Sequence, residues 1–220
     1  WLYTSKGMRS LRERTKTDSV YEEIKKLILR GELSSDTPIS ENYLAQRFGI
    51  SRTPIREALK RLDMEGFVRI IPNQGVFVRD VSISEVKEIY DLRIALEEFV
   101  VKELTHTLSE DDLFVLEGNL ARQEEALRRH DAFAFHEEDR KFHDYFMKAY
   151  GNDMITDFIT NLRDRIEGIN VNMLKQPGNM ELFWGEHRRI LEALRRRDGE
   201  GATREMDEHL KGGKERLLRG

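Results

Sequence analysis

Residues 48–59 read Phe-Gly-Ile-Ser-Arg-Thr-Pro-Ile-Arg-Glu-Ala-Leu, and this stretch decides the fold. Gly49 ends one expected helix, and Ser51 stands where the next helix, about residues 52–65, needs a cap. Pro54 falls in the first turn of that helix, where its missing N–H costs nothing. A tight, glycine-containing turn between two short helices is the connection that a helix-turn-helix motif requires.

Helical spacing also precedes this turn. A first helix is predicted over residues 18–30, because Asp18 and Ser19 can cap its start and Gly31 lies just beyond its end. Ser40 can cap a second, short helix that runs up to the tight turn.

Two short alternating runs, 67–71 and 76–80, follow a helix stop at Gly66. Residues 72–75, Pro-Asn-Gln-Gly, join them, which predicts a β-hairpin with a four-residue turn. Three helices followed by a hairpin are the order of elements in a winged helix-turn-helix domain. This order favours a DNA-binding function for the N-terminal part of the chain.

No strand signal recurs from Ser84 onward, and helical spacing predicts about six more helices. They cover residues 84–106, 110–129, 131–150, 153–174, 179–197 and 200–218. The predicted fold class is therefore mainly α, with a winged helix-turn-helix of three helices plus a hairpin followed by an all-α bundle.

Composition excludes several classes of site. The 220 residues contain no cysteine, which excludes disulfides, thiolate zinc sites, iron–sulfur clusters and cysteine nucleophiles, and fits a reducing, cytoplasmic setting. A mean hydropathy of −0.63 and the lack of long apolar runs predict no membrane span and no signal peptide.

The net charge of −4 is unevenly distributed. Residues 1–80 carry 15 Lys+Arg and 11 Asp+Glu, whereas residues 81–220 carry 22 and 30. A net of +4 on the first part and −8 on the second suggests two modules with different partners, although ordinary surface charge explains the split equally well.

Basic residues follow one face of the third helix. Arg52, Arg56 and Lys60 recur every four residues, opposite an apolar stripe. At the start of a recognition helix, Arg can bind the O6 and N7 of guanine, and Thr53 can contact a phosphate or a thymine methyl. The hairpin tip, 73–75, could lie along the backbone or minor groove. Such stripes are also common on solvated helices, and spacing alone leaves this alternative open.

Four possible metal ligands fall on apolar helix faces. Asp139 and His143 are one helical turn apart, about 6 Å along the axis, on a face rich in phenylalanine. His187 and His209 lie on apolar faces of two other helices. A carboxylate among aromatic rings is costly unless it is paired or binds a metal. Each histidine could equally be an ordinary hydrogen-bonded core residue, so the pattern alone leaves both interpretations open.

The stretch 28–78 resembles the DNA-binding domain of GntR-family bacterial transcription regulators, chiefly through Ser-Arg-Thr-Pro-Ile-Arg-Glu-Ala-Leu at 51–59. The resemblance implies operator contacts at Arg52, Thr53 and Arg56. Many relatives carry Arg where this chain has Asn42, so the preferred operator can differ. The full set of expected DNA-contacting residues is Asn42, Arg52, Thr53, Arg56, Asn73 and Gly75.

The helical remainder resembles the FadR-like subgroup, with its FCD effector domain. The segments that match the metal-binding pattern are 139–143, 151–152, 186–194 and 206–210. The resemblance implies that Asp139, His143, His187 and His209 are metal ligands. Three imidazoles and a carboxylate suit zinc or nickel and leave a position for water or an incoming carboxylate.

Arg93 lies in a helix where the family often turns an arginine toward the cavity, so the resemblance implies an effector contact. A guanidinium matches a carboxylate, but a surface pair with Glu97 is an equal alternative. His136 is a weaker ligand candidate. Residues that could also line the cavity are Asn161, Arg165 and Asn172, whereas His106 and His130 are expected at the surface.

These expectations describe a homodimeric regulator, a repressor, that binds double-stranded operator DNA and responds to a small organic acid bound to its metal. The expected domains are an extension at 1–17, a DNA-binding domain at 18–80 and an FCD ligand-binding and dimerisation domain at 84–220. The chain opens with Trp, so residues 1–8 could be foreign to the natural protein. The alternatives are a metal-dependent enzyme that activates water and a regulator with a purely structural metal.

Overall fold

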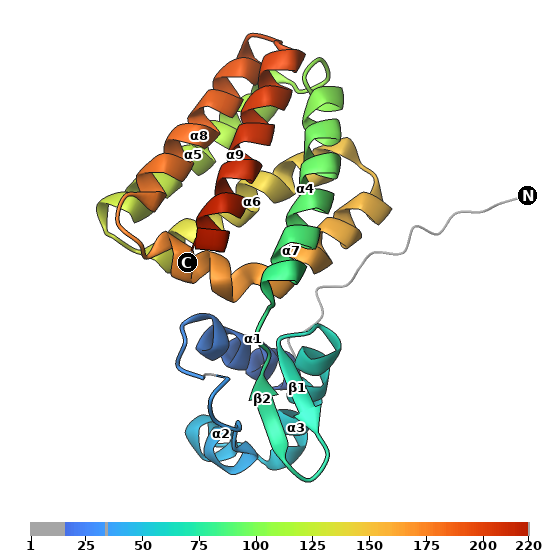
Figure 1. Cartoon of the computed structure of the whole chain (residues 1–220), viewed down its shortest axis with the longest axis vertical. Coiled ribbons are helices and arrows are strands. Elements are labelled where there is room, and N and C mark those ends of the chain that lie inside the picture. The colour runs from blue at the N-terminus through green and yellow to red at the C-terminus, as the bar shows by residue number, and fades with distance from the viewer. Residues whose placement is uncertain (1–15, 34, 220) are drawn as a thin grey trace, which may run out of the picture. The chain divides into compact units, whose positions relative to one another are not determined.

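The structure is a computed structural model that describes residues 16–33 and 35–219 (Figure 1). The described chain separates into two compact units on either side of the Arg79–Asp80 bond. The first unit contains α1 (Lys16–Leu29), α2 (Glu41–Phe48), α3 (Arg52–Met64), β1 (Val68–Ile71) and β2 (Gly75–Val78). The second contains α4 (Ile83–Leu104), α5 (Glu110–Arg128), α6 (Ala132–Tyr150), α7 (Asp153–Leu174), α8 (Asn179–Arg195) and α9 (Gly199–Arg219). The predicted mainly α fold class is confirmed.

The N-terminal unit is built on the contact between α1 and α3. Ile24, Leu44, Ile55 and Leu62 are fully buried, so each of the three helices contributes an apolar stripe to one core. Gly49 ends α2 in the left-handed conformation, as its position before the tight turn requires. The hydroxyl of Ser40 accepts from the Tyr43 N–H at 3.2 Å, as the predicted cap requires.

One predicted cap was wrong, and a second holds the predicted position without making the capping hydrogen bond. The helix α1 already includes Lys16, so Asp18 and Ser19 lie inside it, and Asp18 instead places a negative charge in the first turn and pairs with Arg61. Lys16 and Thr17 therefore belong to α1, and the rest of the expected extension, 1–15, lies outside the described residues. Ser51 holds the extended backbone of a cap position, but its side chain accepts no capping hydrogen bond.

The hairpin pairs β1 with β2 in antiparallel register, with Val68 opposite Val78. A third segment, which lies outside the predicted strands, joins the hairpin through a bridge between Ile39 and Val76. Gly75 has φ +121°, and a Cβ there would lie 3.3 Å from the Cβ of Pro38. The β1–β2 hairpin, the wing of the winged helix-turn-helix, therefore needs glycine at this position for its backbone conformation and for the close approach of the neighbouring loop.

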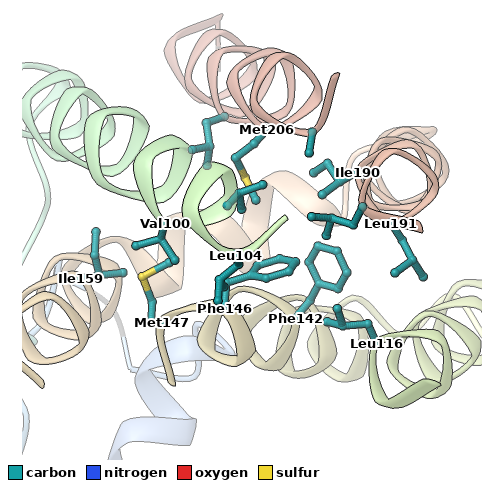
Figure 2. Close-up of a cluster of buried hydrophobic side chains, with 14 of the residues drawn as sticks. Val100, Leu104, Leu116, Phe142, Phe146, Met147, Ile159, Ile190, Leu191 and Met206 are labelled. Atoms are coloured by element: carbon teal, nitrogen blue, oxygen red, sulfur yellow. The ribbon is translucent and has the colours of Figure 1, made fainter. Parts of the chain in front are cut away.

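In the C-terminal unit, α9 lies between α4 and α8 (Figure 1), and α6 packs against α4, α5 and α7. Each of these six helices contributes to a shared apolar cluster in which Phe142 and Phe146 occupy the middle (Figure 2). The predicted helix ends agree with the structure to within two residues. No helix in the described part of the chain is long and apolar enough to cross a membrane.

Candidate metal centre and DNA-reading helix

Three helices bring the four predicted metal ligands together. Asp139 and His143 come from α6, His187 from α8 and His209 from α9, and one ligand atom of each lies within 4.8 Å of the others. The Nε2 of His209 lies 3.1 Å from the Nε2 of His143 and 3.3 Å from that of His187. The Asp139 carboxylate lies 3.5 Å from the His187 Nε2. A set of donors scattered over 71 residues thus converges on one point.

The three imidazoles lie in a dry environment, because none is more than 2% exposed. Burial, and then the neighbouring His209 and His143, hold the pKa of His187 well below its ordinary value. Burial, and then His143 and Arg93, do the same to the pKa of His209. Burial also raises the pKa of Asp139, against the opposing effects of His143 and Arg93. Burial therefore favours the neutral imidazoles that metals bind.

Each imidazole has an oxygen at its outer nitrogen. The Nδ1 of His143 lies 2.6 Å from a Glu97 carboxylate oxygen, and that of His209 lies 2.9 Å from Glu186. The Nδ1 of His187 lies 2.8 Å from the Gln123 side-chain oxygen. A proton on each Nδ1 would leave the three Nε2 lone pairs directed toward one another and Asp139. Metal-ligating atoms placed this close together fit a bound divalent cation.

These outer oxygens were not identified from the sequence. Glu97 is fully buried, and although burial opposes its ionisation, Arg93 and then His143 hold the pKa of Glu97 well below its usual range. Glu186 accepts from Arg216 at 3.0 Å. The i, i+4 spacing of Arg93 and Glu97 was a usable signal, whereas nothing in the sequence indicated that Gln123 lies beside His187.

Arg93 was expected either to face the cavity or to pair with Glu97 at the surface, and the structure combines parts of both. It pairs with Glu97, Nε to oxygen at 2.8 Å, yet it is only 4% exposed and so is not a surface residue. It lines a small cavity beside the candidate metal centre, with about 10 Å³ of internal volume, near the minimum for one water. The other lining residues are Tyr90, His136, Asp139, His143, Asn170, Met173, Leu174, Phe183, His209, Leu210 and Gly213.

The remaining predictions on α7 and the other histidines had mixed outcomes. Asn161 and Asn172 are exposed, and Arg165 pairs with Glu85, so none of the three lines the cavity. Asn170 lines it instead, because the buried face of α7 is turned toward that position. His136 is buried and lines the cavity, whereas His106 and His130 are exposed as predicted.

The predicted DNA-contacting residues are all exposed. Arg52 and Thr53 open α3, and Arg56 follows one turn later, while Ile55 and Leu59 on the opposite face are buried. Asn42 is exposed in the first turn of α2, and Asn73 and Gly75 are exposed at the turn between β1 and β2. Arg56 donates from Nε to Glu41 of α2 at 2.8 Å. The face that would meet a major groove is thus polar and accessible to solvent.

Comparison with known proteins identifies both units. Residues 16–78 match the family "Bacterial regulatory proteins, gntR family", and residues 88–212 match the FCD domain. The HTH-type transcriptional repressor RspR of Escherichia coli (strain K12) is 29% identical over 191 residues, which cover 87% of this chain and 84% of RspR. The gluconate operon transcriptional repressor of Bacillus subtilis is 28% identical over 181 residues, 80% of this chain and 74% of that protein.

Solved structures share the fold. The E. coli McbR/YncC structure has a TM-score of 0.79 at 23% identity and covers 92% of this chain and 97% of its own. A GntR regulator from Rhodococcus sp. RHA1 has a TM-score of 0.80 at 19% identity, covering 93% and 98%. The family and these relatives are transcription regulators and not enzymes, which removes the enzyme alternative. The chain belongs to the GntR family of DNA-binding bacterial transcription regulators and carries an FCD domain.

Proposed function

We propose that this regulator senses a small organic acid through a divalent metal ion held by Asp139, His143, His187 and His209, and that the acid alters operator binding. The observation that carries the proposal is the convergence of three Nε2 atoms and one carboxylate within 4.8 Å, with an oxygen acceptor beside each Nδ1. The donor set suits zinc or nickel. When bound, such an ion supplies a Lewis-acid position for a carboxylate oxygen.

The residues around this centre support recognition of an acid. The Arg93 guanidinium lies in the same small cavity as Asp139 and His143, so it offers a buried cation for a second carboxylate or hydroxyl oxygen. Asn170, also in the cavity wall, can donate to or accept from the ligand. Arg93 would orient the acid, and the three histidines and Asp139 would hold the ion.

Operator recognition is assigned to α3 and the wing. Arg52, Thr53 and Arg56 would contact bases and phosphates of a major groove, and Asn42 would support them from α2. Asn73 and Gly75 would lie at the backbone or minor groove. Repression is the proposed sign of regulation, since the RspR and gluconate operon relatives are described as repressors.

A homodimer is proposed through the apolar side chains of α4 and α7. Leu92 and Phe99 are seven residues apart on one face of α4, with 42% and 44% of their surface exposed. Met154 and Phe158 are exposed on α7, which packs against α4. A second copy would bury these side chains and give the paired recognition helices that a pseudo-palindromic operator needs. Phe99→Glu should convert the dimer to a monomer in sedimentation, and a monomeric wild type would contradict the proposal.

The decisive experiment measures metal content and carboxylate binding together. Purified protein is analysed for metal, stripped with a chelator, reloaded with Zn²⁺ or Ni²⁺ and titrated calorimetrically with citrate, lactate, gluconate and acetate. Binding that requires the metal and is lost in His187→Ala supports the proposal. A metal-free wild type whose carboxylate binding is unaffected by chelation would overturn it.

The small cavity favours a second candidate, in which the ion is purely structural. About 10 Å³ holds roughly one water and no organic acid without movement of the walls. In that case, removing the ion lowers the melting temperature, while no carboxylate changes operator binding. The same titration, followed by an operator-binding assay, distinguishes the two candidates.

A further inference from the structure

A buried chain of amides connects His187 to the backbone of α6. The His187 Nδ1 lies 2.8 Å from the Gln123 oxygen, and the Gln123 Nε2 donates to the Asn119 oxygen at 2.8 Å. The Asn119 Nδ2 donates both to the main-chain carbonyl of Glu138, at 2.9 Å, and to its carboxylate, at 3.0 Å. Gln123 is 0% exposed and Asn119 is 4% exposed, so water does not substitute for these contacts.

The donor and acceptor roles in this series of hydrogen bonds are determined at its α6 end. A main-chain carbonyl only accepts, so Asn119 must turn its NH₂ group toward Glu138 and its oxygen toward Gln123. Gln123 must then donate to Asn119 and turn its own oxygen toward His187. An oxygen there requires a proton on the His187 Nδ1, which leaves the lone pair on Nε2. Reversing either amide would set two oxygens against each other in a dry interior.

We propose that Gln123, held by Asn119, is a positioning residue that fixes the Nδ1-protonated form of His187 and points its Nε2 lone pair at the metal. This inference rests on the proposed metal function. Gln123 would perform this role through His187, without touching the ion itself. Removing a residue that hydrogen-bonds a metal-ligating histidine in this way typically changes metal affinity about 10–100-fold.

The amide is chemically specific at this position. The other two imidazoles face the carboxylates of Glu97 and Glu186, so a carboxylate is an adequate partner for a histidine ligand. At position 123, however, a carboxylate would still accept from His187 but could not donate to Asn119. Its second oxygen would face the Asn119 oxygen, and the Asn119 amide cannot flip because its NH₂ group is held by Glu138. Substitution can therefore separate the two functions of Gln123, which are to accept a hydrogen bond from His187 and to donate one to Asn119.

The test uses the full-length, metal-stripped protein titrated calorimetrically with Ni²⁺, alongside its melting temperature. Gln123→Leu should lower Ni²⁺ affinity about 10–100-fold, because it removes the acceptor for His187. Gln123→Glu should keep nearly the wild-type affinity yet melt at a lower temperature. Thr105→Val is the matched control: Thr105 is fully buried and donates to the Val101 carbonyl at 2.9 Å, away from the centre, so its loss should change stability alone.

A second measurement reports the tautomer directly. Side-chain ¹⁵N spectra of the metal-free protein should show His187 protonated on Nδ1 in the wild type, with the proton moving to Nε2 in Gln123→Leu. Wild-type affinity in Gln123→Leu, or an affinity that follows melting temperature across all four proteins, would overturn the proposal. If the wild type binds neither Ni²⁺ nor Zn²⁺, the metal function fails. The spectra then decide the positioning role by themselves, because an Nε2-protonated wild type contradicts it.

Discussion

Arg56 of α3 is joined to Glu41 of α2, with Nε 2.8 Å from a carboxylate oxygen, while 58% of the Arg56 side chain stays exposed. If Arg56 contacts a base edge as proposed, this pair would restrict the guanidinium before DNA binds and lower the entropy cost of ordering it there. In such a complex the same carboxylate would repel nearby phosphates. Glu41 should therefore favour specific over non-specific binding.

Glu41→Gln should tighten binding to random duplex DNA and reduce the ratio of specific to non-specific affinity. The change should be about fivefold at most, since exposed ion pairs contribute up to about 1 kcal/mol. Fluorescence anisotropy over a salt series, with an operator selected from a random library, measures both affinities. Glu23→Gln removes the same charge from an exposed position on α1, where Glu23 pairs with Lys26 rather than with a residue of α3. An identical effect in both variants would refute a role for the Arg56–Glu41 pair.

Arg52→Ala should relax base preference at one operator position and cost about 1–3 kcal/mol of specific binding. Arg52 is exposed at the first position of α3, where recognition helices meet base edges. Lys60→Ala, two turns further along, should weaken binding to all DNA sequences alike. It should also reduce the salt dependence of binding by an amount equivalent to about one phosphate contact. Equal losses on specific and random DNA in the Arg52 variant would exclude base readout.

Phe146→Ala should destabilise the C-terminal unit by about 3–5 kcal/mol, because it opens a cavity in a fully packed core. Phe146 is 0% exposed, and its ring lies 5.0 Å from that of Phe142, edge to face. Chemical denaturation followed by tryptophan fluorescence reports this unit, since Trp184 lies in α8. Phe114→Ala is the control: Phe114 is 74% exposed, and its truncation should have little effect.

Stability should depend on the ionisation of Glu98. Burial, and then a hydrogen bond with Asp207, raise the pKa of Glu98 to about 7. A raised carboxyl pKa stabilises the fold fully below the unfolded value of about 4.3, and this contribution is lost as the pH rises through 7. Glu98→Gln, which stays neutral, should therefore melt above the wild type at pH 8 and approach it toward pH 5.

The expected gain from Glu98→Gln is below about 1 kcal/mol, because Glu98 is only partly buried and solvent screens the interaction. Differential scanning calorimetry across this pH range measures it. In an Asp207→Asn background the benefit should shrink, since one source of the raised pKa has gone. A pH-independent difference between the two proteins would contradict the assignment.

The local signals in the sequence were sufficient for most elements. Gly49, Gly66 and the alternating runs around residues 72–75 located α3 and the hairpin, and helical spacing put Asp139 and His143 on one buried face. Ile39 was missed because one bridging residue leaves no alternating pattern. Its pairing with Val76 depends on a contact across 37 positions of the chain.

The partners of the histidines could not be predicted for the same reason. Gln123 lies 64 residues before His187, and Glu186 lies 23 before His209, so their contacts follow from how α5, α8 and α9 pack. Periodicity indicates which face of a helix is buried but not which residue of another helix meets it. The predicted cap at Asp18 failed for a different reason, because a suitable residue type marks where a cap can form without requiring one. Ser51 does hold its predicted cap position, but its side chain makes no capping hydrogen bond.

The smallness of the cavity beside Arg93 has a consequence for signalling. A ligand that entered a ready-made pocket with equal affinity in every conformation would shift no equilibrium, however tightly it bound. The cavity holds about 10 Å³, so an acid larger than water that bound there as proposed would have to select or induce an expanded state. Part of the binding free energy of that acid would then be used to separate helices that are packed together in its absence. The tight packing of the ligand-free C-terminal unit is thus what would allow a small molecule to change its shape.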